Sequence, residues 1–400
     1  MSRMSLARVR PQGRRAMLGV ALVGVMGMVI TACGSGTTST EALDEPVAAD
    51  PVVLDYSVDD GDTGVSVIDD VTITAEDGTL QWVSMTNSEG TEVPSVLSAD
   101  KTEWRSDSDL RYGMTYTITT RAQGESGPVE ETIDFTTVAP TNLTAAYMLP
   151  SGGASVGVGQ SAVVQFDEAI SDRQAAQDAI TVTADPPVEG AFYWKDNREV
   201  RWRPKDYWQP GTSVEVEVDI YGKDLGNGMY GEKDTSASFV IGDEVIAVAD
   251  DLTKTITVSR NGEVIKTMPT SMGKAGYDTP VGVYTVGESY ESMIMDSSTY
   301  GVPTDAAEGY RTPVDHAVRM SYSGIFVHSA PWSVWAQGSQ NTSHGCLNVS
   351  PADAAWFYNN LGRGDLVIVK NTGGSPLPGY DGLGDWQVPW ETWKAGNADV

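Results

Sequence analysis

Alternation of apolar and polar residues is the feature that most constrains the fold of this chain. Valines and an isoleucine alternate with carboxylates from Val214 to Ile220, and the stretch from Thr115 to Thr119 alternates in the same way. A period of two residues is typical of half-buried antiparallel strands. The 42 glycines and 20 prolines supply turns between many short strands. The sequence therefore predicts a mainly β protein.

A larger pattern occurs twice along the chain. A tryptophan precedes a tyrosine-glycine turn region, an alternating strand and a second apolar strand, first from Trp104 and again from Trp202. Repeats of this length with many short strands predict two immunoglobulin-like β-sandwiches. We call residues 51–140 module 1 and residues 141–243 module 2. Neither contains a cysteine, so the disulfide of immunoglobulin domains is absent from both.

The sequence pattern changes at residue 244, where the repeat of the two modules ends and a C-terminal domain, residues 244–371, begins. Asn261 and Gly262 separate two alternating runs, which is a strong signal for a hairpin. Ser350 precedes a proline and an acidic residue, so a short helix is expected from there to about Leu361. Residues 372–400, which we call the tail, contain three tryptophans. Tryptophan side chains are costly to expose to water, so we predict that the tail packs back onto the C-terminal domain.

The first 50 residues are predicted to export and anchor the protein. Residues 1–32 carry five arginines, no acid and an apolar run of 15 residues, which is the pattern of a secretory signal. The run ends in Ile-Thr-Ala-Cys33, which resembles the lipobox of bacterial lipoproteins, although an ordinary cleavage site near Ala32 is the alternative. Residues 33–50 are small, polar and acidic, as in a flexible tether. We expect a protein anchored by lipid at Cys33 to the outer face of the cell membrane, facing the wall.

Charge and composition exclude several classes of function. The chain has 55 acidic and 26 basic residues, a formal charge of -29, which repels the phosphates of nucleic acids. Two cysteines and three histidines cannot form a disulfide framework or a zinc finger. The loop from Asp224 through Asn227 and Gly228 collects oxygen atoms, but one carboxylate makes a poor calcium cage, so a simple turn is the stronger interpretation.

The chemistry is predicted to lie between His328 and Asn348. After lipidation of Cys33, Cys346 is the one remaining thiol, in the stretch Thr-Ser-His-Gly-Cys-Leu-Asn. A buried inert cysteine is the plain alternative. His328 follows an apolar strand, and a histidine beside a cysteine lowers the pKa of the thiol. Amides around Gly345 are expected to converge on an oxyanion.

These residues resemble a known signature. His328, fourteen intervening residues and then Ser-His-Gly-Cys-Leu-Asn, residues 343–348, are similar to the catalytic motif of the L,D-transpeptidases with a YkuD-type domain. The Thr-Pro-Val-Gly segment at Thr279 is similar to another segment of that family. The order of lipobox, two immunoglobulin-like modules, catalytic domain and tail resembles the mycobacterial and related actinobacterial members.

The resemblance implies a function and a set of site residues. It implies a Cys346 thioester formed on a donor tetrapeptide stem of peptidoglycan, with release of D-alanine, and a 3→3 cross-link to the diamino acid of an acceptor stem. His328 would be the base, oriented by the carbonyl of Ser329, and the amides of Gly345 and Cys346 would form the oxyanion hole. His344 and Asn348 would shape the pocket. Further substrate positions implied are Tyr300, Tyr310, Ser323, Gly324 and Ser343, with Met295 and Trp332 at a mobile lid.

Other readings stay open beside this one. An L,D-carboxypeptidase would use the same two residues with water as acceptor, and a lipid-anchored wall-binding protein would have lost catalysis. Thiol acyl transfer requires no metal or organic cofactor, and the family resemblance implies that carbapenems inhibit. His316 matches no motif position and is expected to be a surface or structural residue.

Overall fold

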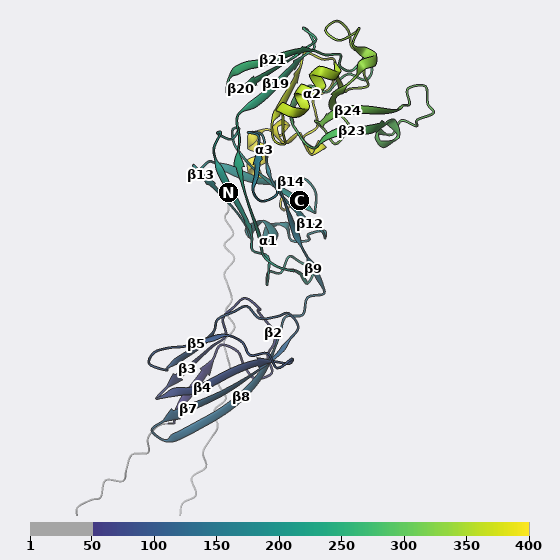
Figure 1. Ribbon diagram of the computed structural model, residues 1–400. Helices are drawn as coiled ribbons and strands as arrows, with labels where there is room; N and C mark the ends of the chain where they lie inside the picture. Colours follow the sequence, from purple (N-terminus) through teal and green to yellow (C-terminus); the bar gives the residue numbers. More distant parts are fainter. Residues whose placement is uncertain (1–50, 400) are drawn as a thin grey trace, which may run out of the picture. The chain divides into compact units, whose positions relative to one another are not determined.

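The structure, a computed structural model, describes residues 51–399 (Figure 1). The predicted signal, Cys33 and the tether therefore lie outside the described residues. Strands dominate every part of the described chain, which confirms the mainly β prediction. In this range no helix has both the length and the apolar character needed to cross a membrane.

Module 1 consists of two four-stranded sheets, with orders β1-β3-β6-β5 and β2-β8-β7-β4. Side chains of the two sheets, Trp104 and Tyr116 among them, form one buried core. The long pair β7 and β8 carries the alternation seen in the sequence, with Tyr116 and Ile118 buried. The strands are β1 Val53–Tyr56, β2 Thr63–Val65, β3 Thr72–Glu76, β4 Gly78–Asn87, β5 Ser95–Leu97, β6 Glu103–Ser106, β7 Thr115–Gly124 and β8 Gly127–Thr137.

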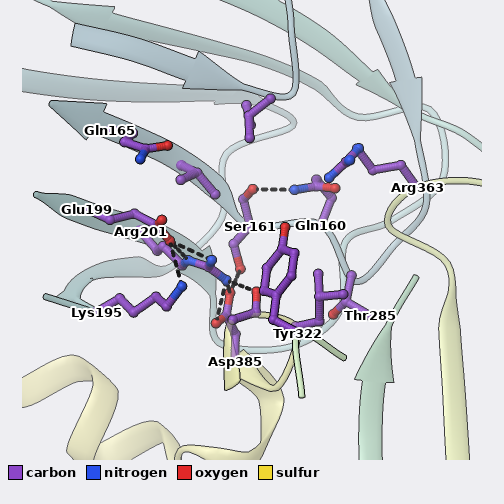
Figure 2. Close-up of a pocket in the computed structure, with 14 residues that line it drawn as sticks. Gln160, Ser161, Gln165, Lys195, Glu199, Arg201, Thr285, Tyr322, Arg363 and Asp385 are labelled. Atoms are coloured by element: carbon purple, nitrogen blue, oxygen red, sulfur yellow. Dashed lines mark hydrogen bonds and ion pairs between the residues drawn. The ribbon is translucent and has the colours of Figure 1, made fainter. Parts of the chain in front are cut away.

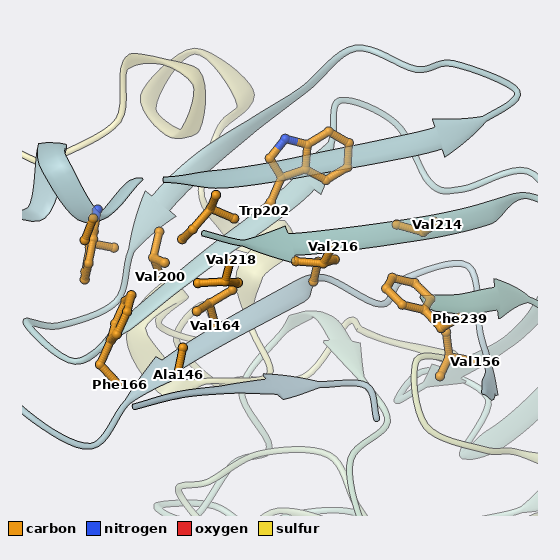
Figure 3. Close-up of a cluster of buried hydrophobic side chains, with 14 of the residues drawn as sticks. Ala146, Val156, Val164, Phe166, Val200, Trp202, Val214, Val216, Val218 and Phe239 are labelled. Atoms are coloured by element: carbon orange, nitrogen blue, oxygen red, sulfur yellow. The ribbon is translucent and has the colours of Figure 1, made fainter. Parts of the chain in front are cut away.

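Module 2 repeats this arrangement with sheets β10-β12-β15-β14 and β11-β18-β16-β13. Its core contains Val214, Val216 and Val218 of β16 packed with Trp202 of β15 (Figure 3). The glutamates between these valines are exposed, as the alternation predicts. The elements are β9 Asn142–Thr144, β10 Ala146–Leu149, β11 Ala154–Val156, β12 Ala162–Phe166, α1 Arg173–Asp178, β13 Ile180–Asp185, β14 Gly190–Trp194, β15 Glu199–Pro204, β16 Ser213–Val218, β17 Met229–Gly231 and β18 Thr235–Ile241.

The C-terminal domain has a five-stranded sheet, β21-β20-β19-β27-β22, and a four-stranded sheet, β23-β24-β25-β26. Buried side chains of both sheets and of helix α2 form its core. Strand β26 lies parallel to β25, a pairing that brings distant segments together. The elements are β19 Val245–Asp250, β20 Thr255–Arg260, β21 Glu263–Pro269, β22 Gly282–Thr285, β23 Ser289–Asp296, η1 Ser297–Tyr300, β24 Arg311–Arg319, β25 Phe326–Ser329, η2 Pro331–Ser333, β26 Leu347–Val349, α2 Pro351–Asn360 and β27 Leu366–Lys370.

Two local predictions for this domain are confirmed. Asn261 and Gly262 both have positive φ, 50° and 83°, and join β20 to β21 as the two-residue turn of a hairpin requires. The Ser350 side chain accepts a hydrogen bond from the amide of Asp353 and caps helix α2. His316 packs its ring edge-on against Tyr358 of that helix, 5.4 Å between centroids, which is a structural role.

The tail corrects one prediction. Its first part does pack on the C-terminal domain, where Leu377 joins the core, but its tryptophans pack on module 2. The indole of Trp386 donates to the carbonyl of Gly159, and that of Trp393 donates to the carbonyl of Ala191. The prediction is confirmed for the first part of the tail and wrong for its tryptophans, because apolar content shows that a segment is buried without showing against which surface. The tail elements are η3 Gly379–Asp381, η4 Asp385–Gln387 and α3 Trp390–Ala395.

Arg203 of β15 provides the docking surface for these rings. Its guanidinium carbon lies 4.5 Å, 5.4 Å and 4.6 Å from the ring centroids of Trp386, Trp390 and Trp393. Burial lowers the pKa of Arg203 to about 10, which leaves it charged at neutral pH. Cation–π contacts of a desolvated arginine are worth up to about 2 kcal/mol each. The tail is therefore held by a charge that sits beneath its aromatic groups.

A cleft of about 320 Å³ lies where module 2, the C-terminal domain and the tail meet (Figure 2). Arg201 of β15 projects into it and binds Asp385 of the tail at 2.9 Å, while its Nε donates to Glu199. Ser161 donates to the same Asp385 carboxylate. Burial lowers the pKa of Arg201, but the two carboxylates outweigh burial and raise it above its usual value. The cleft thus contains a charged network whose members are paired.

Candidate active site

The parallel pair β25 and β26 brings the two halves of the predicted motif together. In its register, His328 lies opposite Asn348, and Val327 lies opposite Leu347, which follows Cys346 directly. His328 is 3% exposed and Cys346 is 8% exposed. Both line one cavity of about 190 Å³. Residues 18 positions apart thus share one site because β25 and β26, which flank the intervening loop, pair with each other.

The cavity contains most of the residues that the sequence predicted. The predicted residues that line it are Met295, Tyr310, His328, Trp332, Ser343, His344, Cys346 and Asn348. Three further lining residues were missed, namely Thr312, Val314 and Thr342. Two of them alternate along β24, so the period of two could have indicated them.

Three predicted substrate positions do not line the cavity or cannot be placed there. Ser323 is exposed and its amide donates to Asp381. Gly324 contributes its carbonyl, which lies 3.5 Å from the sulfur of Cys346. The side chain of Tyr300 lies outside the described part of the structure. Gly324 therefore contacts the predicted nucleophile, whereas Ser323 faces another part of the domain.

The ring of His328 is oriented as predicted. Its Nδ1 lies 2.9 Å from the carbonyl oxygen of Ser329, so Nδ1 carries the hydrogen and Nε2 is left as an acceptor. Burial lowers the pKa of His328 to about 4, and the Ser329 carbonyl only partly opposes this effect. The imidazole is consequently neutral at pH 7, with one lone pair available to accept a proton.

The thiol of Cys346 differs from its predicted state. Burial raises its pKa to about 11, with a contact to the backbone of Phe326 acting in the opposite direction. We expected the histidine to lower this pKa, which is wrong for the resting structure because His328 is uncharged. A neutral imidazole supplies no field to stabilise a thiolate. The resting site therefore holds a thiol and an imidazole, and the proton has to move when the sulfur attacks.

Gly345 is required by the backbone before Cys346. Its φ is +122°, and a Cβ at this position would lie 2.7 Å from Cδ1 of Ile325. Its amide donates to the hydroxyl of Ser343 at 3.1 Å, and that hydroxyl donates to the carbonyl of Cys346 at 2.6 Å. The Gly345 amide is therefore already engaged, which contradicts its predicted place in the oxyanion hole in this conformation.

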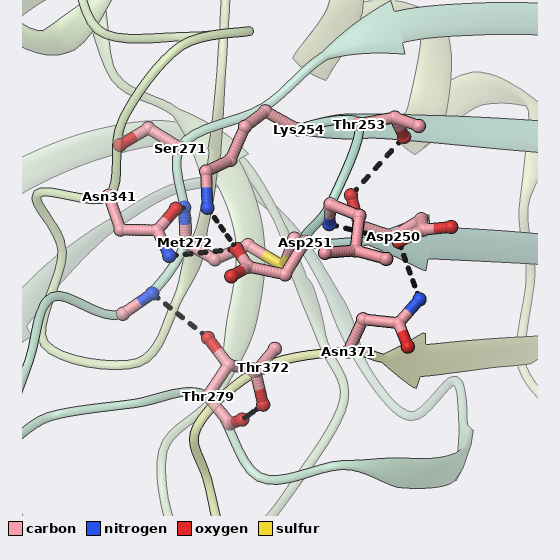
Figure 4. Close-up of polar contacts among 12 residues, drawn as sticks. Asp250, Asp251, Thr253, Lys254, Ser271, Met272, Thr279, Asn341, Asn371 and Thr372 are labelled. Atoms are coloured by element: carbon pink, nitrogen blue, oxygen red, sulfur yellow. Dashed lines mark hydrogen bonds and ion pairs between the residues drawn. The ribbon is translucent and has the colours of Figure 1, made fainter.

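Polar contacts around Thr279 and Asp251 connect segments that lie next to the motif in the chain or in the fold (Figure 4). Thr279, from the Thr-Pro-Val-Gly segment, donates its hydroxyl to the carbonyl of Gly345 at 2.8 Å and accepts from the amide of Gly273. Asn341 donates to the carboxylate of Asp251 at 2.7 Å, and Lys254 binds the same oxygen. The second family-like segment thus supports the backbone of the predicted nucleophile without lining the cavity.

At the rim of the cavity, His344 lies near the predicted Tyr310 and three residues that the sequence did not indicate, Glu308, Lys274 and Tyr277. Its Nε2 lies 2.7 Å from Oε2 of Glu308, and Nζ of Lys274 lies 2.6 Å from the same oxygen. The rings of Tyr277 and Tyr310 lie 4.6 Å and 5.3 Å from the imidazole, centroid to centroid. These residues come from three separated segments, so no local spacing could have found them.

The Asp224 loop remains a weak candidate for a cation. Oδ1 of Asp224 accepts from the amide of Gly226, and the Asn227 side chain donates to Ser171. Within residues 51–399, no group of three or more His, Cys, Asp or Glu side chains is arranged to hold a metal ion. The contacts describe a hydrogen-bonded turn, and a calcium site here stays a prediction.

Comparison with known proteins agrees with this architecture. The family described as bacterial Ig domain matches residues 62–224, and the family described as L,D-transpeptidase catalytic domain matches residues 244–369. The chain is 52% identical over 395 residues to L,D-transpeptidase 2 of Mycobacterium tuberculosis, covering 97% of both proteins. It is 35% identical over 400 residues to L,D-transpeptidase 5 of that species, covering 97% of this chain and 86% of the relative.

A solved structure supports the same relationship for more than half of the chain. The transpeptidase LdtMt1 in complex with imipenem is 38% identical and superimposes with a TM-score of 0.51. The match covers 58% of this chain and 100% of that chain. Imipenem is thus bound by a relative that shares this part of the fold.

Proposed function

Since this chain belongs to the L,D-transpeptidase family of peptidoglycan acyltransferases, we propose that it forms 3→3 cross-links through a thioester on Cys346. The donor is a tetrapeptide stem, attacked at the carbonyl between its diamino acid and its terminal D-alanine. The acceptor is the side-chain amine of the diamino acid on another stem. The observation that carries the proposal is a neutral histidine with a free lone pair in the same cavity as the cysteine thiol.

The first half of the reaction makes the thioester. The Cys346 sulfur forms a bond to the donor carbonyl carbon while its proton passes to Nε2 of His328. The resulting imidazolium then gives this proton to the nitrogen of D-alanine, and the carbon–nitrogen bond breaks. Because the thiol pKa is about 11, proton transfer has to accompany attack rather than precede it. The Ser329 carbonyl, which accepts from Nδ1, stabilises the imidazolium.

The second half transfers the acyl group. The acceptor amine attacks the thioester carbon, loses a proton to His328 and forms an amide bond. The proton returns to the departing sulfur, which restores the thiol. Charge that develops on the carbonyl oxygen requires donors in both halves, and we propose the amide of Cys346 as one of them. Since the Gly345 amide is engaged by Ser343, a shift of this loop is needed before it can act as a second.

A carboxypeptidase differs from this only in the acceptor. Water in place of the amine would convert the thioester into a tripeptide, with the same two residues at work. One experiment separates these outcomes: pure protein is incubated with a disaccharide-tetrapeptide and the products are weighed. A dimer lacking one D-alanine supports the transpeptidase, whereas a tripeptide monomer supports the hydrolase. Unchanged substrate would support a wall-binding protein without catalysis.

A carbapenem provides a second test of the nucleophile. A strained lactam carbonyl is the same kind of electrophile as the donor peptide, and a relative of this chain binds imipenem. Exposure to imipenem should raise the intact mass by one drug equivalent, placed on Cys346 by peptide mapping. Cys346→Ala should show no adduct, and an adduct on that variant would contradict the assignment.

We also propose the cellular position of the protein. The lipobox-like sequence at Cys33 supports export, lipidation and attachment to the outer face of the membrane, next to the wall polymer. A Cys33→Ala variant should lose its lipid mass and leave the membrane fraction or accumulate as precursor. Membrane attachment unchanged in that variant would contradict the anchor.

A further inference from the structure

A single carboxylate oxygen at the rim of the cavity is bound by two nitrogen donors. Oε2 of Glu308 lies 2.7 Å from Nε2 of His344 and 2.6 Å from Nζ of Lys274. Glu308 belongs to the loop between η1 and β24, which we call the rim loop, residues 301–310. Its side chain remains 44% exposed. The carboxylate is therefore held by ionic contacts rather than by burial.

The two donors are held in place without Glu308. The amide of Lys274 donates to the carbonyl of Ser343, the residue before His344, which joins the two segments through their backbones. The imidazole packs against the ring of Tyr277, which lies outside the rim loop, with 4.6 Å between centroids. Nζ of Lys274 lies 5.3 Å from the centroid of the Tyr277 ring. The nitrogen pair is thus preorganised, whereas the group that it binds comes from an exposed loop.

Charge at this rim contrasts with the rest of the chain. The protein carries a formal charge of -29, yet a lysine and a histidine donor meet here beside the cavity that contains Cys346. Lys274 first, and His344 second, hold the pKa of Glu308 below its usual value. The rim loop therefore presents an ionised carboxylate to the pair across the neutral pH range.

We propose that Lys274 and His344 form a subsite for a carboxylate of the donor stem peptide, and that Glu308 occupies this subsite until substrate displaces it. The inference rests on the proposed function, in which the donor ends in D-alanine. The carboxylate of that residue is one residue beyond the attacked carbonyl, and His344 is two residues before Cys346 in the loop that lines the cavity. Glu308 is then an internal competitor, and the subsite favours donors with a free carboxylate.

The proposal predicts that neutralising Glu308 increases the affinity for the donor, whereas a structural role predicts a decrease. If Glu308 only held the rim loop in place, its neutralisation would weaken substrate binding. If it competes, Glu308→Gln should bind the acid form of the donor more tightly, by about 2- to 5-fold, since exposed ion pairs contribute modestly. Lys274→Met should weaken binding of the same donor by about 10-fold, the loss of one charge-assisted hydrogen bond.

The test measures dissociation constants with the full chain in a Cys346→Ala background, so that turnover is not required. Three tetrapeptides are compared: the free acid, the same peptide ending in D-alaninamide, and one with the other stem carboxyl groups amidated. Asp305→Asn, an exposed position in the same rim loop, is the charge-matched control. Tighter binding in Glu308→Gln should appear for the acid and disappear for the D-alaninamide peptide.

The other outcomes are equally informative. If amidation of the other carboxyl groups abolishes the effect, the subsite takes one of those instead of the terminal carboxylate. Weaker binding in Glu308→Gln, or the same gain in Asp305→Asn, would overturn the proposal. Failure of the Cys346 chain to release D-alanine would refute the proposed function alone, because these binding constants are measured without it.

Discussion

Two buried polar sites in this protein treat ionisable groups in opposite ways. In the cavity that contains Cys346, burial moves the pKa values of the thiol and of His328 toward their neutral forms. In the cleft at the tail, Arg201 is equally buried, yet two carboxylates bind it and keep it charged. The first arrangement leaves a proton free to move, and the second leaves none. The buried groups of the proton-transfer site thus lack a partner of opposite charge, whereas the buried arginine of the structural site has two.

The largest expected effect removes the base from the first site. His328→Ala should slow acylation of Cys346 by imipenem by about 10²- to 10⁴-fold, the usual contribution of general-base catalysis. Intact-protein mass recorded against time gives the rate. Arg201→Met serves as the matched control, because it removes an equally buried cation while leaving the cavity unchanged. A rate equal to that of the parent in His328→Ala would remove this residue from the mechanism.

The next effect breaks the charged network of the second site. Arg201→Met should lower the free energy of unfolding by about 3–5 kcal/mol, because Asp385 is left buried without its cation. Adding Asp385→Leu should restore part of this loss, since Glu199 is then the one carboxylate of the pair left without its arginine. Denaturant titration of the three proteins provides the comparison. A double variant less stable than Arg201→Met would show that the network contributes more than its charges.

The sequence predicted one of these two sites and missed the other, because their residues are separated by very different distances along the chain. His328 and Cys346 are joined by adjacent strands, so spacing and residue type were sufficient to predict their meeting. Arg201 and Asp385 are separated by 184 positions, and no local pattern connects them. Lys274, Glu308 and His344 form a similar case at the rim. Backbone periodicity predicts which face of a strand is buried, but it does not predict which remote charge will cover that face.

Two site predictions also depended on states that residue type does not reveal. A cysteine near a histidine suggested a lowered thiol pKa, but burial of both groups dominates in the folded protein. The amide of Gly345 was expected to face the substrate, but the adjacent Ser343 hydroxyl already accepts it. Both errors arise from local burial and hydrogen bonding, which depend on the complete fold.

A third, smaller effect concerns Asp365, a buried carboxyl whose pKa, like those of the first site, is shifted toward the neutral form of the group. Asp365 contacts the Gly157 backbone of module 2, and burial raises its pKa to about 7. The folded protein therefore keeps the Asp365 proton up to a higher pH than the unfolded chain does. The free energy of unfolding consequently falls as pH rises from about 4 to 7. Asp365→Asn should be more stable than the parent by about 2 kcal/mol at pH 8.

Unfolding titrations at pH 4 and pH 8 check this sign. The gain of the variant should be confined to the higher pH, because the parent carboxyl is protonated at pH 4 in the folded state. An equal gain at both pH values would attribute the effect to packing instead of to the charge.

The smallest expected effect is the pH dependence of the first site. Because the pKa of His328 is about 4, the imidazole stays neutral well below pH 6. The acylation rate should therefore change little from pH 7 to pH 5 on account of this group, and fall about tenfold per unit below pH 4. Stopped reactions with imipenem at each pH give the profile. A half-maximal rate near pH 6.5 would indicate an exposed, unshifted histidine.

The attachment of the tail to module 2 has a consequence for the order in which the protein matures. Trp393 is 1% exposed and donates to a carbonyl of β14, although about 200 residues separate the two in the chain. A domain usually folds as a unit once its own residues have been synthesised. Module 2 cannot do so, since the rings that cover Arg203 belong to the last residues of the chain. Its final packing is therefore a late event, which follows the synthesis of the segment from Trp386 to Trp393 rather than the synthesis of module 2 itself.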